Sequence, residues 1–104
     1  MDSNLPFGLE KIEHIGIAVS ELEPAIAAYT TLFGTAPYKQ ETVASQGVHT
    51  VFFKMGESKI ELLAATDAQS PIAKFIAKRG PGIHHIAYAV KDIEACMSHF
   101  KEKG

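Results

Sequence analysis

The sequence predicts an α+β fold built from two βαβββ modules, with the second module truncated after its strand and helix. The first observation is an internal repeat, because a shift of 71 positions places His14 on His85 and Ile15 on Ile86. The second is that each copy opens with an apolar strand and continues with apolar residues at helical spacing. The third is a hairpin pattern around Gly56, which follows the helix of the first copy.

The first module follows a polar lead-in over residues 1–10. Residues 13–19 alternate between bulky and small side chains, which predicts a strand. A capping box at Ser20 and Glu23 predicts the start of a helix, and Gly34 predicts its end. The apolar stripe of this helix is expected to comprise Leu22, Ala25, Ile26, Tyr29 and Leu32.

Three further strands are expected in the first module. Residues 35–47 have a weak pattern that predicts a strand and a loop, whereas residues 48–54 and 59–64 predict the hairpin. Ser70 as N-cap and Pro71 at the first helical position then predict a short helix as far as Lys78. The Gly-Pro-Gly segment that follows breaks this helix and begins the second module.

The second module is predicted to contain a strand at residues 83–90 and a helix capped by Asp92. Its inward residues are expected to be Ile93, Cys96, Met97 and Phe100. Three more strands would complete the repeat, so we expect a C-terminally incomplete chain or strands supplied by a partner. Residues 1–104 are then one domain, with the first module at 12–66, a linker with the short helix at 67–82, and the second module starting at 83–104.

Composition narrows the function classes. The formal net charge is −2 and no basic cluster is visible, so nucleic acid and anionic membrane are not expected as partners. No apolar run approaches the ~20 residues of a membrane span. The single cysteine, Cys96, excludes an internal disulfide and fits a reducing, cytoplasmic location. Its place on the inward helix stripe predicts a small core residue and not a nucleophile.

Two repeated histidines and one glutamate form the candidate site. Strand alternation places His14 and His85 on the face that also carries small residues, which leaves room beside each ring. Glu61 interrupts an apolar strand, where a carboxylate is costly to bury unless it is paired or bound to a cation. Mixed imidazole and carboxylate ligands suit Zn²⁺, Co²⁺, Ni²⁺ or Mn²⁺.

Simpler interpretations exist for each of these side chains. Either histidine alone could be a hydrogen-bonded residue at a strand start, and Glu61 could face solvent. The equivalent positions of His14 and His85 in the repeat favour a shared metal site. We expect His49 and His99 to face solvent, and His84 to point away from the site because it is adjacent to His85.

Four stretches resemble the vicinal oxygen chelate (glyoxalase-like) superfamily and, within it, the methylmalonyl-CoA epimerases. They are Ile12-Glu13-His14-Ile15-Gly16-Ile17-Ala18-Val19, Lys59-Ile60-Glu61-Leu62-Leu63, Ser70-Pro71-Ile72-Ala73-Lys74-Phe75 and Gly82-Ile83-His84-His85-Ile86-Ala87. The strand motifs indicate the superfamily. The helix that begins at Ser70-Pro71, together with the Glu61 strand, favours the epimerases.

The resemblance implies a metal-dependent isomerase that interconverts the R and S forms of methylmalonyl-CoA at C2, through an enolate chelated by the metal. It implies a divalent ion (Co, Zn, Ni, Mn or Mg) at His14, Glu61 and His85, and an acyl-CoA thioester as substrate. A homodimer is also expected, because the first strand of the second module has an unpaired edge, and such edges tend to find partners. The alternatives are another metalloenzyme of the superfamily, such as a glyoxalase-like lyase, and a non-catalytic module that binds small molecules.

The catalytic base is not identified by the sequence. Epimerases of this type carry a glutamate base where this chain has Ser45, and a serine hydroxyl is too weak a base unaided. The nearest upstream carboxylate is Glu41. With the second module incomplete, a further glutamate is missing, so whether the 104-residue chain alone is active stays open.

Overall fold

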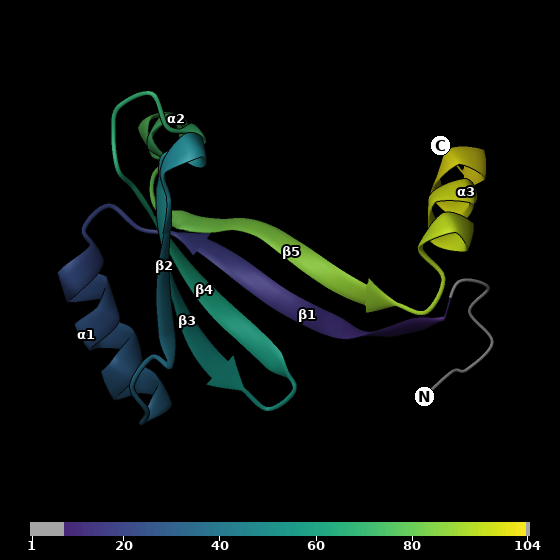
Figure 1. The fold of residues 1–104 in the computed structure, drawn as a ribbon, viewed down its shortest axis with the longest axis horizontal. Coiled ribbons are helices and arrows are strands. Elements are labelled where there is room, and N and C mark those ends of the chain that lie inside the picture. The colour runs from purple at the N-terminus through teal and green to yellow at the C-terminus, as the bar shows by residue number, and fades with distance from the viewer. Residues whose placement is uncertain (1–7, 104) are drawn as a thin grey trace.

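The computed structural model describes residues 8–103, which form one mixed sheet and three α-helices (Figure 1). The expected α+β class is confirmed. No helix in this range is both long enough and apolar enough to cross a bilayer. In chain order the elements are β1 (Leu9–Ala18), α1 (Leu22–Phe33), β2 (Lys39–Val43), the 3₁₀ helix η1 (Ala44–Gln46), β3 (Val48–Met55), β4 (Ser58–Ala65), α2 (Pro71–Arg79), β5 (Gly82–Val90) and α3 (Ile93–Lys103).

The first strand is longer than predicted. It starts at Leu9 and not at Glu13, because its early residues pair with β5, where Leu9 lies opposite Val90. The predicted polar lead-in over residues 1–10 is therefore wrong for its last two residues, and residues 1–7 lie outside the described part of the chain.

The sheet has the strand order β2-β3-β4-β1-β5. β1 runs parallel to β4 and antiparallel to β5. The two repeated strands are therefore direct neighbours, and the repeat-equivalent Ile15 and Ile86 are paired with each other. We call the β1–β5 ladder the seam, because it brings together the equivalent segments of the two copies.

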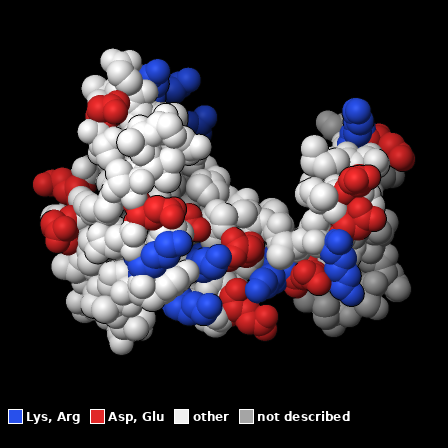
Figure 2. All heavy atoms as spheres, in the orientation of Figure 1, with Lys and Arg blue, Asp and Glu red and all other residues white. Residues whose placement is uncertain are grey.

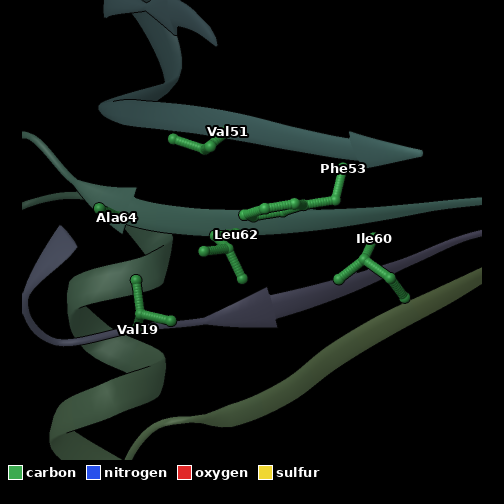
Figure 3. Close-up of a cluster of buried hydrophobic side chains, with 6 residues drawn as sticks. All are labelled: Val19, Val51, Phe53, Ile60, Leu62 and Ala64. Carbon is green, nitrogen blue, oxygen red and sulfur yellow. The ribbon is translucent and has the colours of Figure 1, made fainter. Parts of the chain in front are cut away.

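One face of the sheet is covered by α1. Its side chains pack on a cluster that includes the fully buried Val51 and Phe53 (Figure 3). Tyr29 belongs to this packing, as predicted. Leu32 does not, because it is 73% exposed, and Phe33 takes its place with its ring 5.4 Å from that of Phe53. Phe33 lies four residues after Tyr29, so the two side chains share one helix face.

The start of α1 differs from the prediction. Its N-cap is Glu21, whose side chain makes no cap hydrogen bond, so the capping box of Ser20 and Glu23 does not form. The chain is still held to the sheet at Val19, whose N–H donates to the carbonyl oxygen of Leu63 at 2.9 Å. The helix consequently begins one residue later than a cap at Ser20 would require.

Two other predicted helix ends are confirmed. Gly34 ends α1 in the left-handed conformation, at φ 70°, which favours glycine. Ser70 caps α2, because its Oγ accepts a hydrogen bond from the N–H of Ile72 at 3.1 Å, and Pro71 is the first helical residue.

The opposite face of the sheet is only partly covered. α2 packs on one end of it, over a cluster of Ala18, Val48, Leu63 and Ile72. Strand alternation puts His14 and Glu61 on this same face, because β1 and β4 pair in register with residue 14 opposite residue 59. α2 therefore lies next to the candidate residues on this face but does not cover them.

α3 lies at the far end of the β1–β5 pair (Figure 1). In Figure 2 the same part of the chain stands apart from the main body, with a hollow between them. The turn before α3 is held to the start of β1, because the N–H of Lys91 donates to the carbonyl oxygen of Gly8 at 3.0 Å. The predicted cap is confirmed, since Asp92 Oδ1 accepts from the N–H of Ala95 at 2.9 Å.

The predicted inward stripe of α3 is wrong for most of its residues, and the helix does not cover the bulky face of β5. Tyr88 is 57% exposed and Ile86 is 42% exposed. Cys96 is buried as predicted. The other members of the predicted inward stripe are mostly exposed, namely Ile93, Met97 and Phe100. The apolar spacing of α3 is therefore real, but the turn at Lys91 directs the helix away from the sheet.

Candidate metal centre

His14, Glu61 and His85 converge on the partly covered face of the sheet. They come from β1, β4 and β5, which are adjacent. One ligand atom from each residue lies within 4.8 Å of the others. His14 Nε2 is 3.0 Å from His85 Nε2, and His14 Nδ1 is 3.5 Å from Glu61 Oε2. Two sequence-distant histidines are thus brought together at the seam.

Gly16 makes this approach possible. It is paired with Glu61 on one side and with His85 on the other. A Cβ atom built on Gly16 would lie 2.3 Å from Cε1 of His85, closer than real Cβ contacts allow. The His85 ring therefore lies directly over the backbone of β1. Small residues on this face were predicted to leave room beside the histidines, and Gly16 is the residue that does so for His85.

Burial shapes the electrostatics of the cluster. Desolvation raises the pKa of Glu61, an effect that the nearby His14 partly opposes. Desolvation also lowers the pKa of His85, and the neighbouring His14 and His84 rings add to this. A buried carboxylate that lacks full compensation and an imidazole that favours its neutral form are both suited to a cation.

The seam contains a β-bulge beside each of the two histidines. The ladder passes from the pair Ile12–Tyr88 to the pair His14–Ala87, so Glu13 has no opposite residue. It likewise skips His84. A bulge changes the direction of a side chain relative to simple alternation. Both bulges therefore bring a further residue to the site that strand parity does not predict.

His84 is the first of these residues, and its predicted orientation is wrong. Its Nδ1 lies 3.0 Å from Nδ1 of His85, and its ring packs edge-on against Phe75 at 4.9 Å. It also lines the cavity beside the site. Simple alternation would have placed it on the opposite face, and the bulge is the reason that it is not there.

Glu13 is the second, and sequence reasoning missed it. Its Oε1 lies 2.5 Å from His14 Nδ1, and its Oε2 lies 2.8 Å from Lys59 Nζ. The hydrogen bond with His14, followed by that with Lys59, lowers the pKa of Glu13 from 4.5 to about 2. An ionised carboxylate can only accept, so this contact favours the tautomer of His14 with the proton on Nδ1.

A cavity of about 560 Å³ lies next to the cluster. Glu61 and His85 form part of its wall, together with η1, neighbouring strand residues, the segment before α2, and the first turn of α2. Ser45, at the position of the family's base, lines this cavity. Glu41 is instead exposed on β2, with its carboxylate 3.8 Å from Lys39 Nζ.

The donor set fits a divalent ion. Two ligand atoms bound at about 2.1 Å, at right angles, lie about 3.0 Å apart. This is the separation of the two histidine Nε2 atoms. Glu61 adds one carboxylate, and the cavity leaves space for further oxygen ligands from a bound molecule. The three side chains therefore form a candidate metal-binding group, in which the spacing of the two histidine nitrogens suits a divalent ion.

The remaining histidines lie elsewhere. His49 was expected to face solvent but is half-buried in a network across β2 and β3. Its Nε2–H donates to Gln40 Oε1 at 3.0 Å, and the hydroxyl of Thr42 donates to its Nδ1 at 2.5 Å. His99 is half-exposed on α3.

The comparison with known families is decisive for the fold. Residues 13–104 match the Glyoxalase/Bleomycin resistance protein/Dioxygenase superfamily. The chain belongs to this superfamily. The vicinal oxygen chelate fold that the resemblance implied is thereby confirmed.

Several named relatives of the chain are epimerases. The ethylmalonyl-CoA/methylmalonyl-CoA epimerase of Cereibacter sphaeroides is 39% identical over 95 residues, which cover 90% of this chain and 71% of that protein. The mitochondrial methylmalonyl-CoA epimerase of Homo sapiens is 36% identical over 98 residues, 93% of this chain and 56% of that enzyme. The chain thus spans little more than half the length of the human relative.

A solved structure gives the same result. The methylmalonyl-CoA epimerase of Streptomyces coelicolor, in complex with 2-nitronate-propionyl-CoA, superposes with a TM-score of 0.80 at 33% identity. The match covers 93% of this chain and 72% of that one. The predicted resemblance to methylmalonyl-CoA epimerases is therefore confirmed in both sequence and structure.

Proposed function

We propose that this protein epimerises methylmalonyl-CoA at C2 in a metal-dependent reaction. The observation that carries the proposal is the cluster of His14, Glu61 and His85, of which Glu61 and His85 line a cavity of about 560 Å³. The epimerase relatives support the reaction class, and the acyl-CoA analogue named in the Streptomyces coelicolor complex supports the substrate class.

The three side chains would act as a fixed frame for the reaction. A divalent ion held by His14, Glu61 and His85 would supply a Lewis acid for an oxygen of the substrate. His14 and His85 direct their Nε2 atoms toward one another, and burial lowers the pKa of His85, which favours its neutral form. Imidazole with carboxylate suits Zn, Co, Ni or Mn, and Mg is the fifth candidate from the family resemblance.

Proton removal at C2 also requires a base. Ser45 lines the cavity and can hydrogen-bond a substrate oxygen, but its hydroxyl is too weak to take this proton unaided. The proposal therefore assigns binding and orientation to the described residues, and assigns the proton-transfer role to none of them.

Solvent exchange at C2 tests the proposal directly. The purified chain, loaded with Co²⁺, is incubated with methylmalonyl-CoA in D₂O, and deuterium at C2 is followed by mass spectrometry. We expect exchange above the spontaneous rate that disappears with a chelator and in the His14→Ala variant. Turnover of a hemithioacetal without C2 exchange would favour a glyoxalase-like lyase. Binding of methylmalonyl-CoA that needs no metal would favour a non-catalytic binding module.

We also propose that the chain is divided into a first module at 12–66, a linker at 67–82 and the start of a second module at 83–104. We further propose that the functional form is a homodimer. β5 is an edge strand of the described sheet, and exposed strand edges tend to pair with another chain. Ile83 and Tyr88 on this strand are 60% and 57% exposed. Light scattering should give twice the monomer mass. A monomer at all concentrations tested would contradict this part of the proposal.

A further inference from the structure

Two of the three register shifts in the seam lie at equivalent positions in the repeat. The shift that places His14 on His85 also places Glu13 on His84. These are the two residues that the ladder skips beside the histidines. Each copy of the repeat therefore contains the same local arrangement, in which a bulged residue directly precedes a histidine of the site.

Each bulged residue contacts the same atom of the histidine that follows it. Glu13 Oε1 lies 2.5 Å from Nδ1 of His14, and His84 Nδ1 lies 3.0 Å from Nδ1 of His85. The two Nε2 atoms face one another at 3.0 Å. Both rings thus direct Nε2 toward the other histidine and Nδ1 toward the preceding residue, and Nδ1 of His14 also lies 3.5 Å from Glu61 Oε2.

The two bulged residues, Glu13 and His84, differ in their hydrogen-bonding chemistry. A carboxylate at position 13 can only accept a hydrogen bond, which requires a proton on Nδ1 of His14 and leaves the Nε2 lone pair directed toward the centre. An imidazole at position 84 can either donate or accept, so it does not impose a tautomer on His85. The carboxylate therefore distinguishes His14 from its repeat equivalent.

Lys59 fixes the carboxylate in place. Its Nζ donates to Oε2 of Glu13 at 2.8 Å, which leaves Oε1 for His14. Lys59 lies opposite His14 in the β1–β4 ladder, so strand pairing holds it beside the same ring. The Glu13 side chain is about one-third exposed, which means that two contacts, and not deep burial, define its position.

We propose that Glu13, held by Lys59, is a positioning residue that selects the Nδ1–H tautomer of His14 and so prepares Nε2 to bind a divalent cation. This inference rests on the metal site of the proposed function and deepens it. A carboxylate that accepts from the outer nitrogen of a metal-binding histidine orients the ring and raises the basicity of the inner nitrogen.

The tautomer is measurable without metal, substrate or turnover. Long-range ¹H–¹⁵N correlation spectra of the metal-free, ¹⁵N-histidine-labelled chain, at a pH where the ring is neutral, show which nitrogen of His14 carries the proton. We expect Nδ1–H in the wild type and a shift toward Nε2–H in Glu13→Leu, which keeps much of the volume and removes the acceptor. Glu13→Gln keeps an acceptor oxygen and should restore Nδ1–H.

Metal affinity is the second readout. Calorimetric titration with Co²⁺ should show a loss of about 10- to 100-fold in Glu13→Leu, the usual range for such outer contacts. Glu10→Leu is the matched control, because Glu10 is also skipped by the β1–β5 ladder and is exposed. Lys59→Met should lower the affinity less than Glu13→Leu, since the acceptor remains.

The inference is overturned if wild-type His14 carries its proton on Nε2, or if Glu13→Leu retains both the wild-type tautomer and the wild-type Co²⁺ affinity. Failure of the proposed function is a separate outcome. Absence of C2 exchange with methylmalonyl-CoA would leave the tautomer and Co²⁺ results unchanged, so the two ideas fail independently.

Discussion

Replacing Gly16 by alanine is the sharpest test of how the seam builds the site. The added Cβ would lie 2.3 Å from Cε1 and 2.7 Å from both ring nitrogens of His85, whereas ordinary contact begins at 3.4 Å. The ring would have to move by about 1 Å, which is several times the ~0.2 Å tolerance of a metal–ligand distance. We expect the Co²⁺ affinity to fall at least about tenfold, comparable to the loss of an outer contact.

The stability of the metal-free protein should also change, and its sign depends on two opposing effects. Alanine at a position without positive φ stabilises by about 0.4–1 kcal/mol, because it restricts the unfolded chain. Gly16 is such a position. Overpacking costs about 1–3 kcal/mol, so the clash with His85 should outweigh this gain.

A double-mutant cycle separates these two effects. In a His85→Ala background the ring is absent, so Gly16→Ala should become neutral or stabilising in urea unfolding. Retention of wild-type Co²⁺ affinity in Gly16→Ala would refute the reasoning. So would an equal change in unfolding free energy in the two backgrounds, because the effect would then not arise from the contact with His85.

Three further predictions follow from the site and its surroundings. His85→Ala should sharply lower the metal content of the purified protein, whereas His84→Ala should retain most of it; equal content in both variants, measured by elemental analysis, would contradict the assignment. Glu13 has a folded-state pKa of about 2 against 4.5 when unfolded, so its contribution to stability is present above pH 4.5 and is lost as the pH falls toward 2. The destabilisation caused by Glu13→Gln should therefore be seen in urea unfolding at pH 7 and disappear at the acidic end, and a pH-independent difference would argue against the contacts described. Ser70→Ala should cost about 1 kcal/mol through loss of the α2 cap to Ile72, which thermal unfolding can measure against the exposed Ser45→Ala.

Much of the site could be predicted because side chains alternate regularly between the two faces in most of the sheet. His14, Glu61 and His85 share a face through simple alternation, and the repeat indicated that the two histidines belong together. Alternation failed at Glu13 and His84, where the bulges change the direction of the side chains. A bulge depends on the register between two strands, so no local pattern in either segment predicts it.

The helices show a related limit. The spacing of apolar residues correctly predicted α1 and α3, but spacing alone does not specify what a helix packs against. The α1 stripe covers the sheet, with Phe33 in place of Leu32. The equivalent stripe of α3 leaves Met97 and Phe100 about 60% exposed. The difference arises from the direction of the turn at Lys91. This turn is held by a tertiary contact with Gly8, which helix spacing does not predict.

Because the candidate site lies at the seam, ion binding there would depend on the pairing of β1 with β5. His14 and His85 lie on different copies of the repeat, so a cation can bind both only while β1 and β5 remain side by side. By mass action, such an ion would stabilise the folded state by about 2.7 kcal/mol at one hundred times its dissociation constant. A bound ion would then stabilise the pairing of β1 with β5. The melting temperature of the protein would consequently depend on the free metal concentration, even in the absence of substrate.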